Sequence, residues 1–311
     1  MDVATNASNA FVALSDGLRV FDGFATSSPR LIGAVDYGFS TSEVVDVATF
    51  GSHVAVDASG FDGKILVFDV SDPALPRKAT EIGSHSPADF RSMAASGDHV
   101  LMVGNWFDPD DLDEYLWVAM FDVNDPSEPV SWWSYDISDP VVDIAADDTH
   151  AYIPVACCSL RIVDISEPSQ PVEVGRFPEY GWSVEVSGSR VFMMGSYYNR
   201  GFGILIIDVS DPTAPDEAGF VPVAQYQEFG DFAANGSYLF IVNSDHGIHV
   251  HDISEPSAPV DLGFVNPSSE PTRVAASAAA AWATVGGAGL KTIRPCELPP
   301  PRDTGGRRGA D

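Results

Sequence analysis

One ten-residue phrase occurs five times in this chain, and this repetition constrains the fold more than any other feature. VFDVSDPALP at 67–76 returns as MFDVNDPSEP at 120–129, IVDISEPSQP at 162–171, IIDVSDPTAP at 206–215 and VHDISEPSAP at 250–259. A chain that repeats one phrase at a steady interval is built from one structural unit, copied along its length.

Two weaker copies flank the clear five. VFDGFATSSP at 20–29 keeps the Asp and the final Pro, while TIRPCELPPP at 292–301 keeps the final Pro but has Arg294 in place of the Asp. The Asp position then recurs at intervals of 42 to 53 residues. The sequence therefore predicts seven units.

A period in the forties is typical either of propeller blades or of helical HEAT and armadillo repeats. Each unit contains short runs of β-branched and aromatic residues, such as HVAVDA, YLFIV and GILIIDV, broken by Gly, Asn, Asp and Pro. Such runs indicate strands, and no stretch sustains a helical period over three turns. We predict an all-β, seven-bladed β-propeller of four-stranded antiparallel blades over residues 1–301, followed by a flexible polar tail over 302–311.

The four strands of a unit, A to D from the channel outward, are placed most clearly in the sixth unit. Strand A is expected at Phe229–Ala234, B at Tyr238–Asn243, C at Gly247–Asp252 and D at Val260–Val265. The phrase Asp then ends strand C, where its carboxylate can accept a hydrogen bond from a backbone N–H two or three residues on. This role in a turn explains the repeated Asp without any chemistry.

The phrase, which reads apolar-apolar-Asp-Ile/Val-Ser-Asp/Glu-Pro-x-x-Pro, resembles the LVIVD-repeat family over essentially all of residues 1–301. That resemblance implies a bacterial or archaeal propeller, secreted or at the cell surface. It implies no particular activity, because the family has no established common one, and a fold alone does not specify a function.

Residues 1–5 align with strand A of the first unit, and no strand D of the type VDLGF follows the last phrase. We expect either a three-stranded last blade or a blade completed by an upstream strand that is missing from this chain, together with a signal peptide. No transmembrane run is present in the sequence. From the family resemblance, and with a signal peptide presumed to be missing from this chain, we expect an extracellular or cell-surface protein.

The formal net charge of −29, from 45 acidic against 16 basic residues, argues against electrostatic binding of nucleic acid or of anionic membranes, and no membrane insertion is expected. Protein or glycan partners are expected, and the chain is expected to be a monomer. Because the charges repel one another, salt or divalent cations should raise the melting temperature, and an unchanged value from low to high salt would contradict this.

Three cysteines in 311 residues do not form a disulfide framework. Cys157 and Cys158 are adjacent between strands B and C of the fourth unit, while Cys296 follows strand C of the seventh, on the opposite face. A bridge from Cys296 to either is not expected. A bridge between Cys157 and Cys158 stays open.

Variation in loop length is concentrated on the face that carries the B-to-C and D-to-A loops. There the longest B-to-C loop is expected at Asn105–Tyr115, and another is expected within 195–203. Aromatic residues in or beside these loops favour binding by stacking, although they can equally cover the blade ends. The predicted ligand-binding residues are Phe61, Trp106, Phe107, Trp182, Tyr197, Tyr198, Arg200 and Tyr226.

Carboxylates suggest two places for a cation. The loop at 108–114 holds five of them but lacks the spacing of a calcium-binding EF-hand. One register position of strand A reads Asp2, Asp46, Ser92, Asp143, Ser183, Asp231 and Arg273, which would lie at one height around the channel. Calcium is the candidate ion there, with Asp46, Asp143 and Asp231 as ligands; the alternative is that each Asp bonds backbone N–H groups of the neighbouring blade.

No nucleophile elbow or phosphate loop occurs in the chain. The sequence therefore favours a non-catalytic binding or scaffold module. The alternative is a calcium-dependent propeller hydrolase or lyase that uses the carboxylates at the channel mouth.

Overall fold

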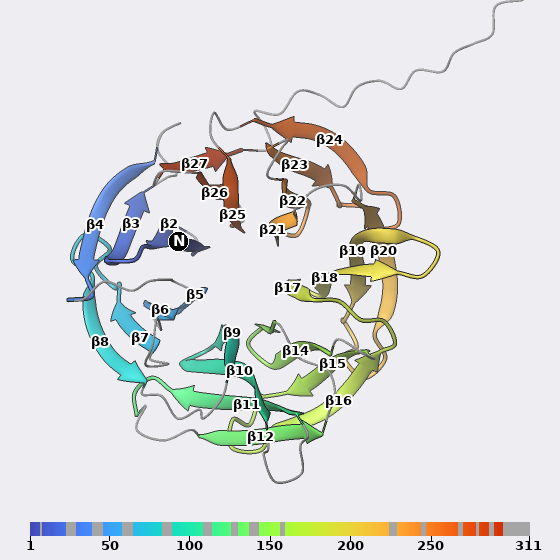
Figure 1. Cartoon of the computed structure of the whole chain (residues 1–311), viewed down its shortest axis with the longest axis horizontal. Helices are drawn as coiled ribbons and strands as arrows, with labels where there is room; N and C mark the ends of the chain where they lie inside the picture. Colours follow the sequence, from blue (N-terminus) through green and yellow to red (C-terminus); the bar gives the residue numbers. More distant parts are fainter. Residues whose placement is uncertain are drawn as a thin grey trace, which may run out of the picture.

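The computed structural model describes residues 1–6, 8–22, 29–38, 46–57, 65–82, 89–107, 114–125, 130–136, 143–155, 159–223, 229–243, 247–266, 270–277, 280–285 and 289–294. These residues form 27 strands in seven sheets, which are arranged as blades around a central axis (Figure 1). Among them, no helix has the length and apolar character needed to cross a membrane.

The first four blades follow one another along the chain. Blade one holds β1 (Asp2–Thr5), β2 (Asn9–Ala13), β3 (Gly17–Asp22) and β4 (Arg30–Asp36); blade two holds β5 (Asp46–Phe50), β6 (His53–Asp57), β7 (Ile65–Asp69) and β8 (Arg77–Ile82). Blade three holds β9 (Asp89–Ser96), β10 (His99–Phe107), β11 (Glu114–Asp122) and β12 (Ser131–Asp136); blade four holds β13 (Ala145–Ala146), β14 (His150–Val155), β15 (Ser159–Asp164) and β16 (Val172–Phe177).

The last three blades close the ring. Blade five holds β17 (Ser183–Ser187), β18 (Arg190–Tyr197), β19 (Gly201–Asp208) and β20 (Asp216–Pro222); blade six holds β21 (Phe229–Ala234), β22 (Tyr238–Asn243), β23 (Gly247–Asp252) and β24 (Val260–Val265). Blade seven has three strands in its described part, β25 (Pro271–Ala276), β26 (Ala281–Val285) and β27 (Gly289–Ile293).

The predicted architecture is confirmed. Every blade is an antiparallel sheet of consecutive strands, with strand A innermost, and the sixth blade has the predicted strand bounds. Seven units give seven blades because each unit closes its own hydrogen-bonded sheet and leaves only its two faces to pack against neighbours.

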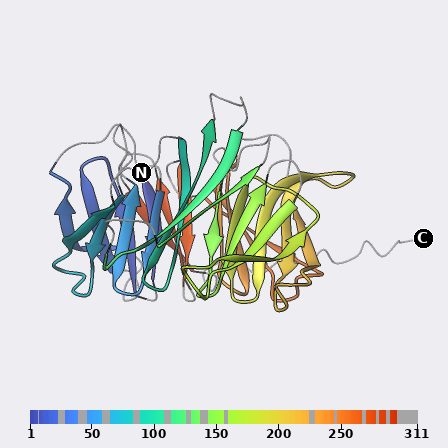
Figure 2. The same ribbon diagram turned by 90° about the horizontal axis from the view of Figure 1, so that it is seen from below.

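The expected loop at Asn105–Tyr115 is wrong in its bounds. Strands β10 and β11 continue into it as a hairpin, and Trp106 pairs with Tyr115. Likewise β18 and β19 extend until Tyr197 pairs with Gly201 across a turn in which Asn199 has a φ of 63°. Aromatic residues favour extended backbone, so these segments lengthen the sheet. The two hairpins project from the same side of the ring (Figure 2).

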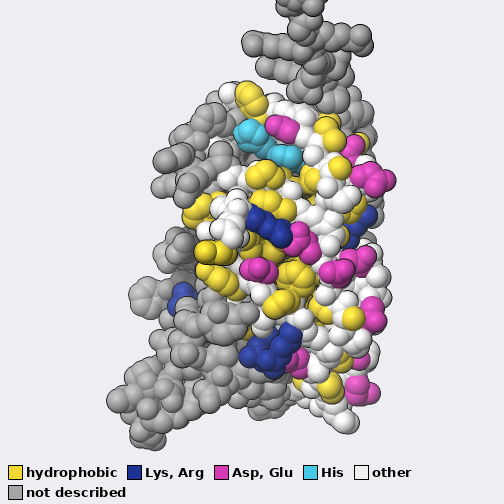
Figure 3. Space-filling model, turned by 90° about the vertical axis from the view of Figure 1, so that its right-hand side faces the viewer, with side chains coloured by type: hydrophobic (Ala, Val, Ile, Leu, Met, Phe, Trp, Pro, Cys, Tyr) yellow, Lys and Arg dark blue, Asp and Glu magenta, His cyan; other side chains and the backbone are white. Residues whose placement is uncertain are grey.

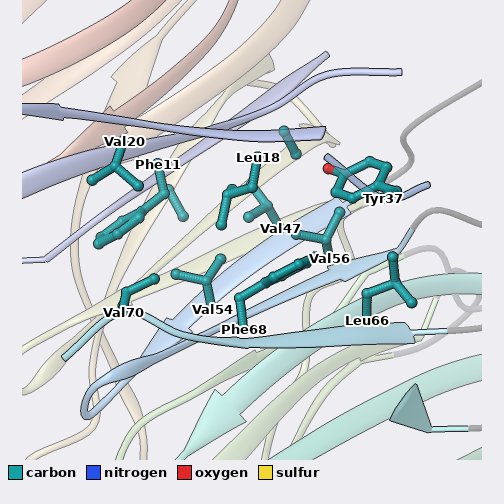
Figure 4. Close-up of a cluster of buried hydrophobic side chains, with 12 residues drawn as sticks. Phe11, Leu18, Val20, Tyr37, Val47, Val54, Val56, Leu66, Phe68 and Val70 are labelled. Atoms are coloured by element: carbon teal, nitrogen blue, oxygen red, sulfur yellow. The ribbon is translucent and has the colours of Figure 1, made fainter. Parts of the chain in front are cut away.

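Hydrophobic side chains between blades form the core. Between blades one and two, Phe11 and Leu18 pack with Val54 and Phe68, all of them at most 1% exposed (Figure 4). Six more clusters of this kind include residues from neighbouring blades. Each blade is therefore buried on both faces, which explains why its B and C strands are continuously apolar.

The repeated phrase makes the predicted turn. In five blades the backbone N–H two residues beyond the phrase Asp donates to its carboxylate, as Ser71 does to Asp69 at 2.9 Å and Ser210 to Asp208 at 2.8 Å. These hydrogen bonds hold the pKa of Asp208 below its ordinary value.

The phrase also contacts the neighbouring blade. A Cβ atom on Gly33, Gly175 or Gly219 of strand D would lie 1.7 to 2.0 Å from the carbonyl oxygen of the first phrase proline of the next blade. Only glycine therefore fits at these three positions. The Gly–Pro contact fastens the outer edges of successive blades.

Blades one and seven close the ring by packing of a different kind. Trp282 of β26 is fully buried against Val3, Ala10 and Val12 of blade one. In addition, the hydroxyl of Thr5 donates to the carbonyl oxygen of Ala276 at 3.1 Å. The first and last blades are thus joined by side-chain contacts.

Candidate functional site

The central channel holds a cavity of about 480 Å³ to which all seven blades contribute. The wall is formed by residues of the innermost strands and by residues directly before them, including all seven positions predicted to lie at one height. The hairpins β10–β11 and β18–β19 project from one side of the ring (Figure 2). We call this space the channel cavity.

A continuous chain of hydrogen bonds runs along one side of the channel cavity. The hydroxyl of Ser92 lies 3.1 Å from Oδ2 of Asp46 and 2.8 Å from Oδ1 of Asp143. The hydroxyl of Ser183 then donates to Oδ2 of Asp143 at 2.8 Å. Blades two to five are thereby linked at one height.

The same carboxylates also accept backbone N–H groups of the following blade, as the alternative interpretation of the sequence expected. Met93 donates to Asp46, Val184 to Asp143 and Val274 to Asp231, each at 2.8 Å. On the seam between the first and last blades, Arg273 lies 3.6 Å from Asp2. These side chains hold the inner strands together.

The predicted calcium ligands are only partly brought together. Asp46 and Asp143 are connected through Ser92, whereas Asp231 bonds blade seven. Within the described residues, no three His, Cys, Asp or Glu side chains are arranged to hold a metal ion. Calcium binding stays a prediction.

Glu185 is a channel residue that the sequence interpretation missed. Two residues beyond the ring position, six blades have alanine (Ala4, Ala48, Ala94, Ala145, Ala233 and Ala275), and blade five alone has a glutamate. Oε2 of Glu185 accepts the backbone N–H of Ala234 at 2.9 Å. The difference between glutamate and alanine is visible in the alignment of the inner strands, two residues beyond the register position of Asp2 and its counterparts.

Burial raises the pKa of every acidic side chain in the channel wall. Removal from water is the largest cause for Glu185, whose pKa rises to about 8 with help from the carboxylates of Asp231 and Asp143. The pKa of Asp231 rises to about 7, and burial together with the nearby Asp2 raises that of Asp46 well above its ordinary value. The channel cavity therefore changes its charge near neutral pH.

Four aromatic side chains belong to blade five or to the segment that leads into it, and three of them are exposed. Tyr198 is 89% exposed, Tyr180 40% and Trp182 37%, and the ring of Trp182 lies 5.8 Å from that of Phe202. We call these four residues the aromatic platform. Trp182 also lines the channel cavity, so the platform and the cavity meet at this residue.

The outer side of the ring at blades five and six shows hydrophobic side chains among acidic and basic ones (Figure 3). On blade five, Arg200 pairs with Glu217 at 2.6 Å and lies over the ring of Phe220. Tyr197 is buried and donates its hydroxyl to the carbonyl oxygen of Met193 at 2.6 Å. It therefore supports the platform from inside the blade.

The other predicted binding residues are less defined. Phe61 and Tyr226 lie outside the described residues, and for Trp106 and Phe107 only the position on β10 is described. The acidic segment 108–113 and all three cysteines also lie outside them.

Comparison with known proteins agrees with the repeat and the fold. A solved chain from "Crystal Structure of Mitotic Checkpoint Complex" has a TM-score of 0.65 and 13% identity, over 94% of this chain and 89% of that one. At this identity the likeness concerns the fold alone. No curated protein matches the chain.

The family model described as "LVIVD repeat" matches residues 140–178, 199–222 and 229–266. These segments carry three of the five clear phrases, in blades four, five and six, and over these blades the resemblance inferred from the phrase is confirmed. The chain therefore carries LVIVD repeats in blades four to six of a seven-bladed β-propeller.

Proposed function

We propose that this protein is a non-catalytic binding module, secreted or at the cell surface, for protein or glycan partners. The observation that carries the proposal is the exposed aromatic platform of blade five, which opens onto the channel cavity through Trp182. Exposed aromatic rings on a rigid frame suit stacking on a sugar or packing against a protein side chain.

The backbone beside Trp182 and Tyr180 is tightly packed against β18, which supports this proposal. A Cβ on Gly181 would lie 2.3 Å from the carbonyl oxygen of Met194, and a Cβ on Gly195 would lie 2.7 Å from that of Tyr180. The backbone N–H of Trp182 donates to Met194 at 2.9 Å. A rigid aromatic surface loses little conformational entropy when it binds.

The channel carboxylates support a structural role over a catalytic one. Asp46, Asp143 and Asp231 each accept the backbone N–H of the next residue and a backbone N–H of the following blade. A general acid or a metal ligand would need at least part of this capacity for the substrate or the ion.

The experiment is a screen of the purified protein against arrays of glycans and of synthetic peptides. Ligands found with the wild type should be lost with Trp182→Ala and Tyr198→Ala. The matched control is Leu75→Ala, because Leu75 is 74% exposed within the repeated phrase on the other face. Binding that is equal in all four proteins, or no binding to either array, would contradict the proposal.

Calcium dependence is tested separately by calorimetry on the chelator-treated protein. Stoichiometric binding that is lost in Asp46→Asn and Asp143→Asn would place the ion in the channel and favour the hydrolase or lyase alternative. Equal heats for calcium and buffer would contradict the calcium prediction.

A further inference from the structure

The channel cavity has an uneven distribution of charge. Five acidic side chains line it (Asp2, Asp46, Asp143, Glu185 and Asp231), against two arginines (Arg91 and Arg273). Arg273 is engaged by Asp2 at the seam between blades one and seven. The side formed by blades four to six, where Asp143, Glu185 and Asp231 lie, is therefore the acidic side.

Glu185 is placed to receive a ligand at a greater depth than the ring of aspartates and serines. Its Oε2 bonds Ala234, while Oε1 has no hydrogen-bond partner within the described residues. Alanines occupy the same layer in the other six blades, so the space in front of Oε1 is not filled by long side chains. Glu185 follows Trp182 by three residues of extended chain, about 10 Å.

We propose that the channel cavity receives an arginine or lysine side chain from a basic segment of a partner protein. The guanidinium or ammonium group reaches Oε1 of Glu185, and the aliphatic stem lies against the ring of Trp182. This rests on the proposed binding function and names the chemistry of its partner.

Three properties of charge and shape fit this occupant. The formal net charge of −29 attracts basic segments and speeds their encounter with the protein. An aromatic wall at the mouth stabilises a passing cation through its π face. Long basic side chains bury their stems along apolar surface while the charged head reaches polar groups.

Binding of the cation is coupled to release of a proton. Glu185 faces Asp143 and Asp231 across the adjacent blades, and its pKa of about 8 keeps it mainly protonated at pH 7. Asp2, Asp46, Arg91 and Arg273 complete the charged groups of the wall. A cation prefers the carboxylate, so its affinity rises with pH until Glu185 is ionised.

The test uses a fluorescent peptide of eight residues with one central arginine among glycines and alanines. Its matched control replaces the arginine by citrulline, which has the same shape without the charge. We expect the arginine peptide to bind the full chain at least tenfold more tightly than the citrulline peptide. The affinity should increase from pH 6 to about pH 9, where Glu185 is mostly ionised, and then level off.

Glu185→Gln keeps the bond to Ala234 and removes the charge, so it should weaken binding of the arginine peptide at least tenfold and abolish the pH dependence. Glu255→Gln makes the same change in net charge on the exposed phrase of blade six and should leave binding unchanged. Melting curves of both variants confirm that they fold.

Equal binding of the arginine and citrulline peptides, or equal affinities for Glu185→Gln and Glu255→Gln, would overturn the inference. If neutral glycans bind through Trp182 and the arginine peptide does not, this inference fails while the proposed binding function stands. If free arginine amide binds as tightly as the peptide, the ligand is a small cation and the proposal of a partner protein is wrong.

Discussion

Asp46 of blade two and Asp143 of blade four are joined through a single hydroxyl, that of Ser92, at 3.1 and 2.8 Å. A hydroxyl has one proton and can donate to only one of the two carboxyl groups. The second contact is a full hydrogen bond only when that carboxyl is itself protonated. The raised pKa of Asp46, which arises from burial and from the nearby Asp2, fits this arrangement.

Replacement of Ser92 should therefore destabilise the ring. Ser92→Ala removes the shared donor and should lower the free energy of unfolding by about 1–3 kcal/mol, the usual cost of leaving buried polar groups unpaired. Ser92→Thr keeps the hydroxyl and Ser189→Ala alters an exposed serine, so both should lie near the wild type. Urea unfolding measures all three, and a loss as large for Ser189→Ala would contradict the role of Ser92.

The channel carboxyls also set how stability depends on pH. Because their pKa values are raised in the folded state, to about 8 for Glu185 and about 7 for Asp231, the folded protein holds protons that the unfolded chain releases. Their contribution to stability is complete below their ordinary pKa values near 4 and is lost as pH rises through 7 and 8.

The melting temperature should thus fall between pH 5 and pH 9, and Glu185→Gln should reduce that fall. At pH 9 the variant should melt above the wild type, and at pH 5 the two should be close. Asp164 and Asp208, whose turn hydrogen bonds lower their pKa values, affect stability only at more acidic pH. Parallel pH curves for wild type and Glu185→Gln would refute the assignment; Glu255→Gln serves as the charge control.

Closure of the ring depends on Trp282. This side chain is fully buried between blades one and seven, so Trp282→Ala should lower the free energy of unfolding by about 3–5 kcal/mol. Trp182→Ala removes the same group from an exposed position and should cost far less. Thermal unfolding of the two variants compares them directly, and similar losses would show that the seam is not closed by this packing.

The contact between blades at the outer edge depends on glycine. In Gly219→Ala the new Cβ would lie 1.7 Å from the carbonyl oxygen of Pro256, so strand D or the phrase must move. We expect a loss of at least about 1–3 kcal/mol, as is usual for overpacking. Gly188→Ala adds a Cβ in open space, at a φ of 62°, and shows the backbone penalty alone. A smaller loss at Gly219 than at Gly188 would contradict a tight contact.

Local repetition made the fold predictable from the sequence. The phrase Asp marks the end of strand C in every clear unit, because the same turn hydrogen bonds form each time, and the strands of blade six follow from hydrophobic runs between turn residues. The hairpins of blades three and five were underestimated. Trp106, Tyr115 and Tyr197 were read as loop residues, although cross-strand pairing keeps them in the sheet.

The site was harder to predict because it is assembled from different blades. The ring of Asp46, Ser92 and Asp143 could be found by alignment, since equivalent positions in strand A share one height. The hydrogen-bond partners of these side chains could not be predicted, because they depend on the rotation between neighbouring blades. Glu185 differs from its six alanine counterparts in the same alignment, but its importance shows only when the cavity is seen.

The Gly–Pro contact at the outer edge has a direction, because the glycine belongs to strand D of one blade and the proline carbonyl belongs to the phrase of the next blade. The contact joins blades one and two, four and five, and five and six, so the fifth unit supplies both partners: Pro212 to Gly175 before it and Gly219 to Pro256 after it. A tandem copy of such a unit can make this contact both with the blade before it and with the blade after it. A chain built from such units can gain a blade without evolving a new contact at this edge, whereas the boundary between the last blade and the first depends on Trp282.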